Sequence, residues 1–316
     1  MKQEFRPVNL RVESRLLVEQ CNTIIADYQS QGLRLTLRQL YYQLVTKNVI
    51  PNIEKSYKKL SGLVSDARLS GLMDWDAIED RVRQPRVNSE WDDIVDLVDT
   101  ALQAYRLPRW EGQEHYVELW VEKDALAGVL QPMASKYHVT MMVNRGYSSQ
   151  SAMYEAADRF IRACYPGTSI EDVEFMEDEG ETYLPGDMVK QPILLYLGDH
   201  DPSGEDMVRD IQSRLEMFGL KDMQVIKIAL TMDQVQRYNP PPNPAKRTDP
   251  RAHDYMAKHG AVSWEVDALP PNVLTKIIQV AIEKFVDLDM MQEIRDQEEQ
   301  DKERLRKAAA KLVRKK

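Results

Sequence analysis

The chain has 316 residues, of which 43% are hydrophobic and 29% are charged, and its formal net charge is −9. These values are typical of a soluble protein with two domains, and the acidic balance excludes a uniformly basic protein that coats nucleic acid while allowing local basic patches. No segment approaches the run of about 18 apolar residues that a membrane span needs, and the N-terminus lacks the apolar core of a signal peptide, so we expect no membrane association.

The two cysteines bear on the compartment. Cys21 and Cys164 both fall in helical patterns, which favours buried thiols over a disulfide or a metal site. Because thiols stay reduced in the cytoplasm, a cytoplasmic location is expected.

Two helices are expected near the start of the chain. Residues 12–28 carry an apolar stripe at helical spacing, and Thr36 is a suitable N-cap for a second helix. In that second helix Tyr41 belongs to the apolar stripe, whereas Tyr42 falls off it and shares a face with Arg38, four residues earlier. We therefore expect a buried Tyr41 and an exposed Tyr42 hydroxyl.

A third helix is expected over 53–69, with basic residues on its outer positions and an Arg-rich segment after it. Three short helices followed by such a segment are typical of helix-turn-helix and winged-helix modules, and we assign residues 1–110 to a DNA-binding domain of this kind. A helical subdomain with a solvated basic face is the alternative. The candidates for contacts with the phosphates of double-stranded DNA are Lys58, Lys59, Arg68 and Arg83.

The next part of the chain leads into a second domain. A helix is expected over 90–106, with Ile94, Val98 and Leu102 on one side, and 107–112 is expected to be the interdomain linker.

Residues 111–288 alternate between strand and helix patterns, which predicts an α/β domain with a mainly parallel sheet flanked by helices. Within it an acidic, poorly patterned segment is expected to be a solvated surface insertion, and a charged helical tail is expected after it. The insertion is 169–188, the tail is 289–316, the strands are 116–121, 138–143, 192–197 and 223–229, and the helices are 124–135, 149–163 and 205–218.

Three carboxylates follow two of these strands. Asp199 and Asp201 come directly after an apolar run, with a spacing that points both side chains the same way in extended backbone. Glu122 stands at the corresponding end of the first strand. Because ligands of open α/β sheets bind at the carboxyl ends of strands, and hard cations take oxygen ligands, we expect these three to bind Mg²⁺ or Mn²⁺. Helix capping or a turn is the alternative for any one of them.

Two further acids, Glu265 and Asp267, alternate along a short strand-like piece at 263–269. They have two equally open interpretations. They support the metal site from outside its ligands, or they cap the helix expected from about 272 to 285.

The motifs around the carboxylates resemble a known family. Val-Glu-Lys-Asp-Ala-Leu at 121–126 and Leu-Gly-Asp-His-Asp-Pro-Ser-Gly at 197–204 are similar to the Toprim domain of topoisomerases, bacterial primases and OLD nucleases. The second motif is closest to the A subunit of topoisomerase VI and its meiotic double-strand-break relatives. The resemblance covers roughly 115–285 and implies metal-dependent chemistry on DNA, without deciding which reaction is run.

The run Thr-Leu-Arg-Gln-Leu-Tyr-Tyr at 36–42 resembles the tyrosine helix of the same A subunit. That resemblance implies a topoisomerase-like enzyme that cleaves DNA strands by transesterification, with Tyr42 as the nucleophile, and Arg38 would stabilise the phenolate or the attacked phosphate. In that family the tyrosine of one protomer faces the metal site of the other, so a homodimer is implied. A separate ATPase B-type subunit is a further implied partner, since this chain shows no nucleotide-binding loop. The chain is also shorter than a typical A subunit.

Two other functions stay open. A hydrolytic Toprim nuclease of a defence or mobile element would use water in place of Tyr42 and the same three carboxylates. A DNA-binding protein without catalysis is the third interpretation, and the intact set of one Glu and two Asp argues against it.

Overall fold

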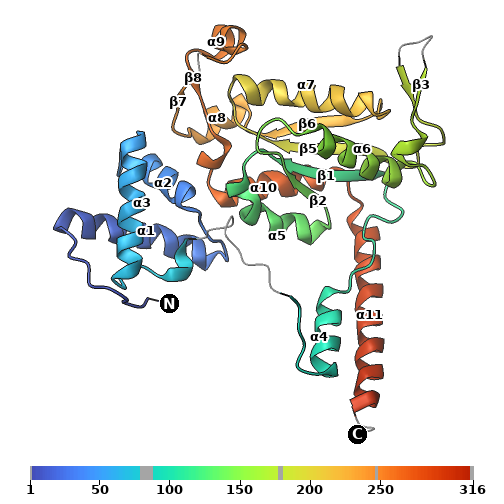
Figure 1. Ribbon diagram of the computed structural model, residues 1–316, viewed down its shortest axis with the longest axis horizontal. Coiled ribbons are helices and arrows are strands. Elements are labelled where there is room, and N and C mark those ends of the chain that lie inside the picture. Colours follow the sequence, from blue (N-terminus) through green and yellow to red (C-terminus); the bar gives the residue numbers. More distant parts are fainter. Residues whose placement is uncertain (1, 79–87, 177–180, 246–247, 314–316) are drawn as a thin grey trace.

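The structure is a computed structural model that describes residues 2–78, 88–176, 181–245 and 248–313. Figure 1 shows three parts: a helical unit at the N-terminus, a sheet with helices on both faces, and a two-helix arm that projects away from the sheet. None of the helices within these ranges is long and apolar enough to cross a membrane.

The N-terminal unit contains α1 (Val12–Ser30), α2 (Leu37–Thr46) and α3 (Glu54–Leu69). The helix α2 begins where predicted, because Thr36 accepts the backbone N–H of Gln39 and the Gln39 side chain accepts the N–H of Thr36 in return. The three helices bury their apolar stripes against one another, and Cys21 is a buried free thiol in that core. A parallel backbone bridge between Leu35 and Ile78 closes the unit.

The sheet has the order β2-β1-β5-β6, and every neighbouring pair is parallel. This confirms the predicted α/β class with a parallel sheet flanked by helices. The order reverses between β1 and β5, since the chain moves outward from β1 to β2 and then returns to the other side. Its strands are β1 (His115–Val121), β2 (Thr140–Val143), β5 (Gln191–Leu197) and β6 (Gln224–Ala229).

Helices bury both faces of the sheet, as parallel strands require. Along β1, Leu119 points toward one layer and Trp120 toward the other, and both are fully buried. One layer contains α5 (Ala127–Tyr137), α8 (Met232–Tyr238) and α10 (Pro271–Ile282), and the other contains α6 (Gln150–Cys164) and α7 (Pro202–Met217).

One charged side chain lies inside this core. Glu118, in the middle of β1, is fully buried. The Nε and Nη2 atoms of Arg159, on α6, donate to its two oxygens at 2.9 and 3.0 Å. The indole N–H of Trp120 and the hydroxyl of Tyr116 donate to the same carboxylate. Glu118 is therefore a paired and fully hydrogen-bonded charge, which makes its burial tolerable.

Two segments differ from their predictions. The acidic insertion is not wholly irregular, because β3 (Glu174–Met176) and β4 (Glu181–Tyr183) pair as an antiparallel hairpin. The expected linker at 107–112 is anchored to the sheet unit, because Trp110 is buried in its core and donates its indole N–H to the carbonyl of Tyr137 at 2.8 Å. Because both segments are locally polar, their sequences did not predict these contacts.

A short antiparallel pair follows β6 in the chain. It joins β7 (Asn243–Pro244) to β8 (Val262–Ser263), and α9 (Ala252–His259) lies between them in the chain. A further bridge joins His200 to Trp264. The segment after β8 is thereby held beside the end of β5.

The arm consists of α4 (Ile94–Ala104) and the outer part of α11 (Leu288–Val313). The helix α4 begins later than predicted because the Asp93 side chain accepts the N–H groups of Val95 and Asp96 and so caps it. The predicted helical tail is confirmed as α11. The base of α11 is anchored in the sheet unit, where Met291 is buried.

Candidate active site

The predicted carboxylates meet where the order of the strands reverses, the usual ligand position in open α/β sheets. Val121 and Leu197 are register partners at the ends of β1 and β5, so Glu122 and Asp199 follow side by side. The Glu122 backbone N–H donates to the Leu197 carbonyl at 2.8 Å, and the Asp199 N–H donates to Glu122 Oε2 at 2.9 Å. The sequence thus predicted correctly that acids from two strands lie together.

Asp201 combines a structural contact with a place in the site. Its Oδ1 accepts the N–H of Gly204 at 2.7 Å and the hydroxyl of Ser203 at 2.9 Å, and so it caps α7. A Cβ at Gly204 would lie 2.2 Å from the Asp199 carbonyl oxygen. The turn therefore requires glycine here, because only glycine allows the helix to approach the end of β5 so closely.

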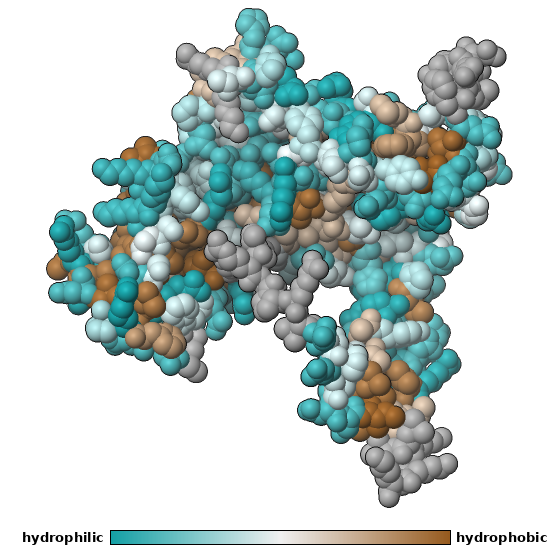
Figure 2. Space-filling view, in the orientation of Figure 1, coloured by the Kyte–Doolittle hydropathy of each residue, from teal (hydrophilic) through white to brown (hydrophobic). Residues whose placement is uncertain are grey.

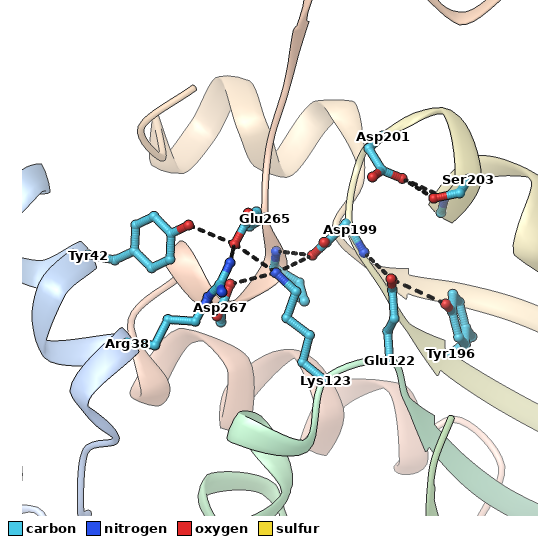
Figure 3. Close-up of polar contacts among 12 residues, drawn as sticks. Arg38, Tyr42, Glu122, Lys123, Tyr196, Asp199, Asp201, Ser203, Glu265 and Asp267 are labelled. Atoms are coloured by element: carbon cyan, nitrogen blue, oxygen red, sulfur yellow. Dashed lines mark hydrogen bonds and ion pairs between the residues drawn. The ribbon is translucent and has the colours of Figure 1, made fainter. Parts of the chain in front are cut away.

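Glu265 and Asp267 lie beside these carboxylates. Lys123, the residue after Glu122, places its ammonium 2.9 Å from each of them and 3.0 Å from Asp199 Oδ1 (Figure 3). The helix α10 begins after Pro270 with no side-chain cap, so the capping interpretation of the two acids is wrong. No role for Lys123 was predicted, although its place inside the Val-Glu-Lys-Asp motif at 121–124 was a usable signal.

The N-terminal unit contributes the other wall of the site. The Tyr42 hydroxyl donates to Glu265 Oε2 at 2.6 Å. Arg38 forms an ion pair with Glu265, and its Nε lies 2.9 Å from Asp267 Oδ2. Its guanidinium also lies 5.7 Å from the centre of the Tyr42 ring. These contacts join α2 to the segment after β8 (Figure 3).

The expectation of an exposed Tyr42 is wrong. Its side chain is only 4% exposed, as deeply buried as Tyr41. Tyr41 packs in the helical unit, as predicted, and its hydroxyl donates to Asn52 at 3.0 Å. Tyr42 is off the apolar stripe of α2, as predicted, but the face it occupies is covered by Glu265 from the sheet unit. A pattern within one helix could not show that contact.

A cavity of about 460 Å³ lies between the two units. Tyr42 and Arg38 line it from α2, and Asp199, Asp201 and Glu265 line it from the sheet unit. The structure therefore brings the predicted nucleophile and two of the predicted metal ligands to one opening, within a single chain.

The positive and negative charges of the cluster are unequal in number, and the pKa values of its carboxylates shift in opposite directions. Burial raises the pKa of Asp199 to about 7, with Glu122 adding to the effect and Lys123 opposing it. Burial acts to raise the pKa of Glu265 too, but the charges of Lys123 and Arg38 outweigh it and bring that pKa down to about 2. Carboxylates with such separated pKa values in one cleft are a common feature of catalytic sites.

The same surroundings hold Tyr42 in its neutral form. Burial, together with the negative charges of Asp267 and Glu265, raises the pKa of the Tyr42 hydroxyl well above its ordinary value, while Arg38 opposes this only in part. In this arrangement the hydroxyl is a poor nucleophile.

The donor set suits a hard cation. Glu122, Asp199 and Asp201 each keep one carboxylate oxygen that accepts no hydrogen bond among the described residues. Oxygen donors of this kind are the ones that Mg²⁺ prefers. Across the same described residues, however, no group of three or more acid, His or Cys side chains is already spaced to hold an ion. The positive charge beside Asp199 is that of Lys123.

Two of the residues predicted to contact DNA are exposed on α3. Lys58 forms an ion pair with Glu54, one turn earlier, at 2.7 Å, and Lys59 is exposed beside it. Arg83 lies outside the described residues.

Arg68 has a different environment. Its Nη2 donates to the carbonyls of Trp75 and Ile78, and its guanidinium lies 5.0 Å from the centre of the Trp75 ring. These contacts tie the end of α3 to the segment that follows it, so the structure gives Arg68 a role within the unit.

Comparison with protein-family models gives no match to this chain, and comparison with curated proteins gives none either. The cleft is therefore interpreted from its own geometry and chemistry.

Proposed function

We propose that this protein cleaves DNA strands by metal-dependent transesterification, in the manner of the topoisomerase VI A subunit that its motifs resemble. The observation that carries the proposal is that Tyr42 and Arg38 line one side of a cavity of about 460 Å³ while Asp199 and Asp201 line the other. A tyrosine, an arginine and a pair of acids at one opening are the groups that transfer of a phosphodiester to a tyrosine needs.

In the proposed reaction Tyr42 Oη attacks a DNA phosphorus. A bond forms between Oη and phosphorus, the bond to the leaving deoxyribose oxygen breaks, and that oxygen takes up a proton. Arg38, which lines the cavity, and Lys123, which is paired with Asp199, are our candidates to bind the phosphate oxygens. Glu122, Asp199 and Asp201 would hold Mg²⁺ or Mn²⁺, and when bound this ion supplies positive charge that stabilises the negative charge developing at phosphorus.

The proton of Tyr42 has one nearby acceptor, Glu265, at 2.6 Å. In this structure the transfer of the Tyr42 proton to Glu265 is unfavourable. Lys123 and Arg38 keep the pKa of Glu265 at about 2, while the pKa of Tyr42 is raised. A phosphate that draws these two cations away from Glu265 would make that carboxylate a better base. We infer that this arrangement, with both cations paired to Glu265, is a resting state and that DNA itself activates it.

A hydrolytic nuclease is the second candidate, and the burial of Tyr42 favours it. The hydroxyl of a residue that is only 4% exposed, and that is hydrogen-bonded to a carboxylate, is less available than water. The same three carboxylates would serve this reaction, and Tyr42 would then hold the two units together.

Trapping the protein on DNA under denaturing conditions separates the two candidates. Transesterification leaves the protein covalently attached to the cut end, and Tyr42→Phe should abolish that adduct. Tyr41→Phe is the matched control and should keep the adduct, because its hydroxyl faces Asn52. Free cut ends from wild type, formed at the same rate by Tyr42→Phe, would reject the transesterase in favour of the nuclease.

A mixture of two inactive variants tests whether the site is completed by a second protomer, as the resemblance implies. If the tyrosine acts on the partner's metal site, Tyr42→Phe and Asp199→Ala chains together regenerate one intact site and nick DNA. If the cavity works within one chain, as the contacts of Tyr42 suggest, the mixture stays inactive. The winged-helix assignment, the double-stranded DNA partner and an ATPase B-type subunit belong to the same proposal.

A further inference from the structure

The helix α4 has an apolar face that is wider than its neighbour α11 can cover. Leu102 is buried and Val98, one turn earlier, is half-buried, so these two face α11. A second row, which we call the seam, is exposed on the same helix. Figure 2 shows hydrophobic surface toward the outer end of the arm. The seam consists of Ile94, Leu97, Ala101 and Ala104.

The spacing of the seam is that of a helix-packing surface. Its residues follow one another at intervals of three, four and three, the repeat by which helices pack in bundles and coiled coils. Ile94 is 55% exposed and Leu97 is 43% exposed. On α11, Leu305 is 40% exposed and Ala308, three residues on, is exposed beside it. Small alanines in such rows allow two helices to approach closely.

The charges along the arm indicate which kind of partner fits the seam. Residues 90–104 contain five acidic residues and no Lys or Arg, whereas 302–310 contains four basic residues and one acid. DNA is a poor occupant, because the acids of α4 border the seam. A partner needs an apolar helix edged with cations, and the outer part of α11 in a second copy has that character.

The direction of the two helices fits this pairing. Within one chain the Tyr105 hydroxyl donates to Asp301, and the Leu107 N–H donates to Glu298. The end of α4 therefore lies beside the inner part of α11, so the two helices run antiparallel, and Ala101 lies level with Leu305. A two-fold axis along the arm would place each α4 between two antiparallel α11 helices. That is an up-down four-helix bundle with alternating acidic and basic members.

We propose that the arm is a homodimerisation element, in which the seam of each copy packs against α11 of the other copy to form a four-helix bundle. The proposal does not rest on the proposed function, because the seam lies outside the cleft. Different measurements test the two proposals: the molecular mass tests dimerisation through the arm, and DNA cleavage tests the function of the cleft.

Sedimentation of the full chain over a concentration series tests the proposal. Wild type should reach twice the mass of the chain, and Leu97→Glu should weaken the dimer by at least about tenfold. Leu16→Glu makes the same change at an exposed leucine of α1 and should leave the dimer intact, and circular dichroism checks that both variants are folded. A monomeric wild type, a dimeric Leu97→Glu, or equal loss in both variants would overturn the proposal.

Cross-linking tests the arrangement without disturbing the seam by charge. Ala101→Cys and Leu305→Cys chains, mixed and oxidised, should form a mixed disulfide in higher yield than either chain forms with itself. The native cysteines do not compete, because Cys21 and Cys164 are both buried. No disulfide between chains, or a dominant bond between two Ala101→Cys chains, would contradict the alternating bundle.

Discussion

Two regions of this protein bury carboxylates against cations, and they do so differently. In the sheet, one acid, Glu118, meets one arginine, Arg159, and every remaining contact of the acid is filled by Trp120 and Tyr116. In the cleft, the acids outnumber the cations, and the group lines an open cavity. The members of that group are Glu122, Asp199, Asp201, Glu265 and Asp267 as acids, with Arg38 and Lys123 as cations.

The difference separates a structural charge from a functional one. A closed, balanced pair has nothing left to bind, and its loss damages the fold. An unbalanced group at an opening keeps carboxylate oxygens available and holds negative charge that a cation would relieve. The comparison therefore predicts opposite outcomes for substitutions in the two places.

The largest expected effect is on activity in the cleft. Asp199→Asn should lower Mg²⁺-dependent DNA cleavage by at least about 10²–10³-fold, the cost of removing one preorganised charge-stabilising group. At pH 4, where the buried Asp199 carboxyl is protonated and uncharged like the amide that replaces it, stability should change by less than about 1 kcal/mol. Plasmid cleavage and denaturant unfolding measure the two quantities. A variant that unfolds but still cleaves would reverse the comparison.

The sheet should show the reverse pattern. Glu118→Gln removes the negative partner of Arg159, whose side chain is 35% exposed, and replaces a carboxylate oxygen that accepts from Tyr116 or Trp120. We expect a loss of about 1–3 kcal/mol in the free energy of unfolding. Glu155→Gln removes an exposed acid from the same helix and should cost less than about 0.5 kcal/mol. Equal stability of the two variants in urea would show that the buried pair contributes little.

Titration sharpens the comparison further. Burial raises the pKa of Asp199 to about 7, so the folded protein holds a proton there that the unfolded chain has lost. The stabilisation from this group is complete below pH 4 and is lost as pH rises through about 7, with a slope of at most about 1.4 kcal/mol per pH unit. Asp199→Asn should remove this slope between pH 4 and 7. Parallel curves for variant and wild type would contradict the assignment.

The smallest effect concerns the exposed cations. If Lys59 contacts a DNA phosphate, Lys59→Gln should reduce the slope of log affinity against log salt by about 1. Arg68→Gln is the contrast, since its guanidinium holds the carbonyls of Trp75 and Ile78. We expect it to lower the melting temperature of the helical unit. An unchanged salt slope in Lys59→Gln would remove that residue from the DNA surface.

Local pattern predicted much of this fold. Each strand of the sheet begins and ends within two residues of its expected place, because continuous apolar runs such as Ile193–Leu197 have few other solutions. Thr36 caps α2 as predicted, since capping depends on near neighbours. The position of Glu122 beside Asp199 followed from the parallel order alone.

In the site, what local pattern did not predict depends on contacts between residues more than 100 positions apart. The burial of Tyr42 is imposed by Glu265, which lies 223 residues away. The pairing of Lys123 with Asp267 spans 144 residues. The exposed seam of α4 could not be predicted either. An amphipathic pattern shows that a helix has an apolar face, but it does not show how much of that face other elements bury.

The length of α11 has a mechanical consequence. Its 26 residues extend about 39 Å at a rise of 1.5 Å per residue. The base is fixed by Met291 in the core and by Arg295, which donates to the carbonyl of Lys136. The helix is thus a lever, and a rotation of about 10° at its base carries the tip about 7 Å at that length. With two such arms joined, small rotations would change the separation of the two sheet units by about the width of a DNA major groove, ~12 Å.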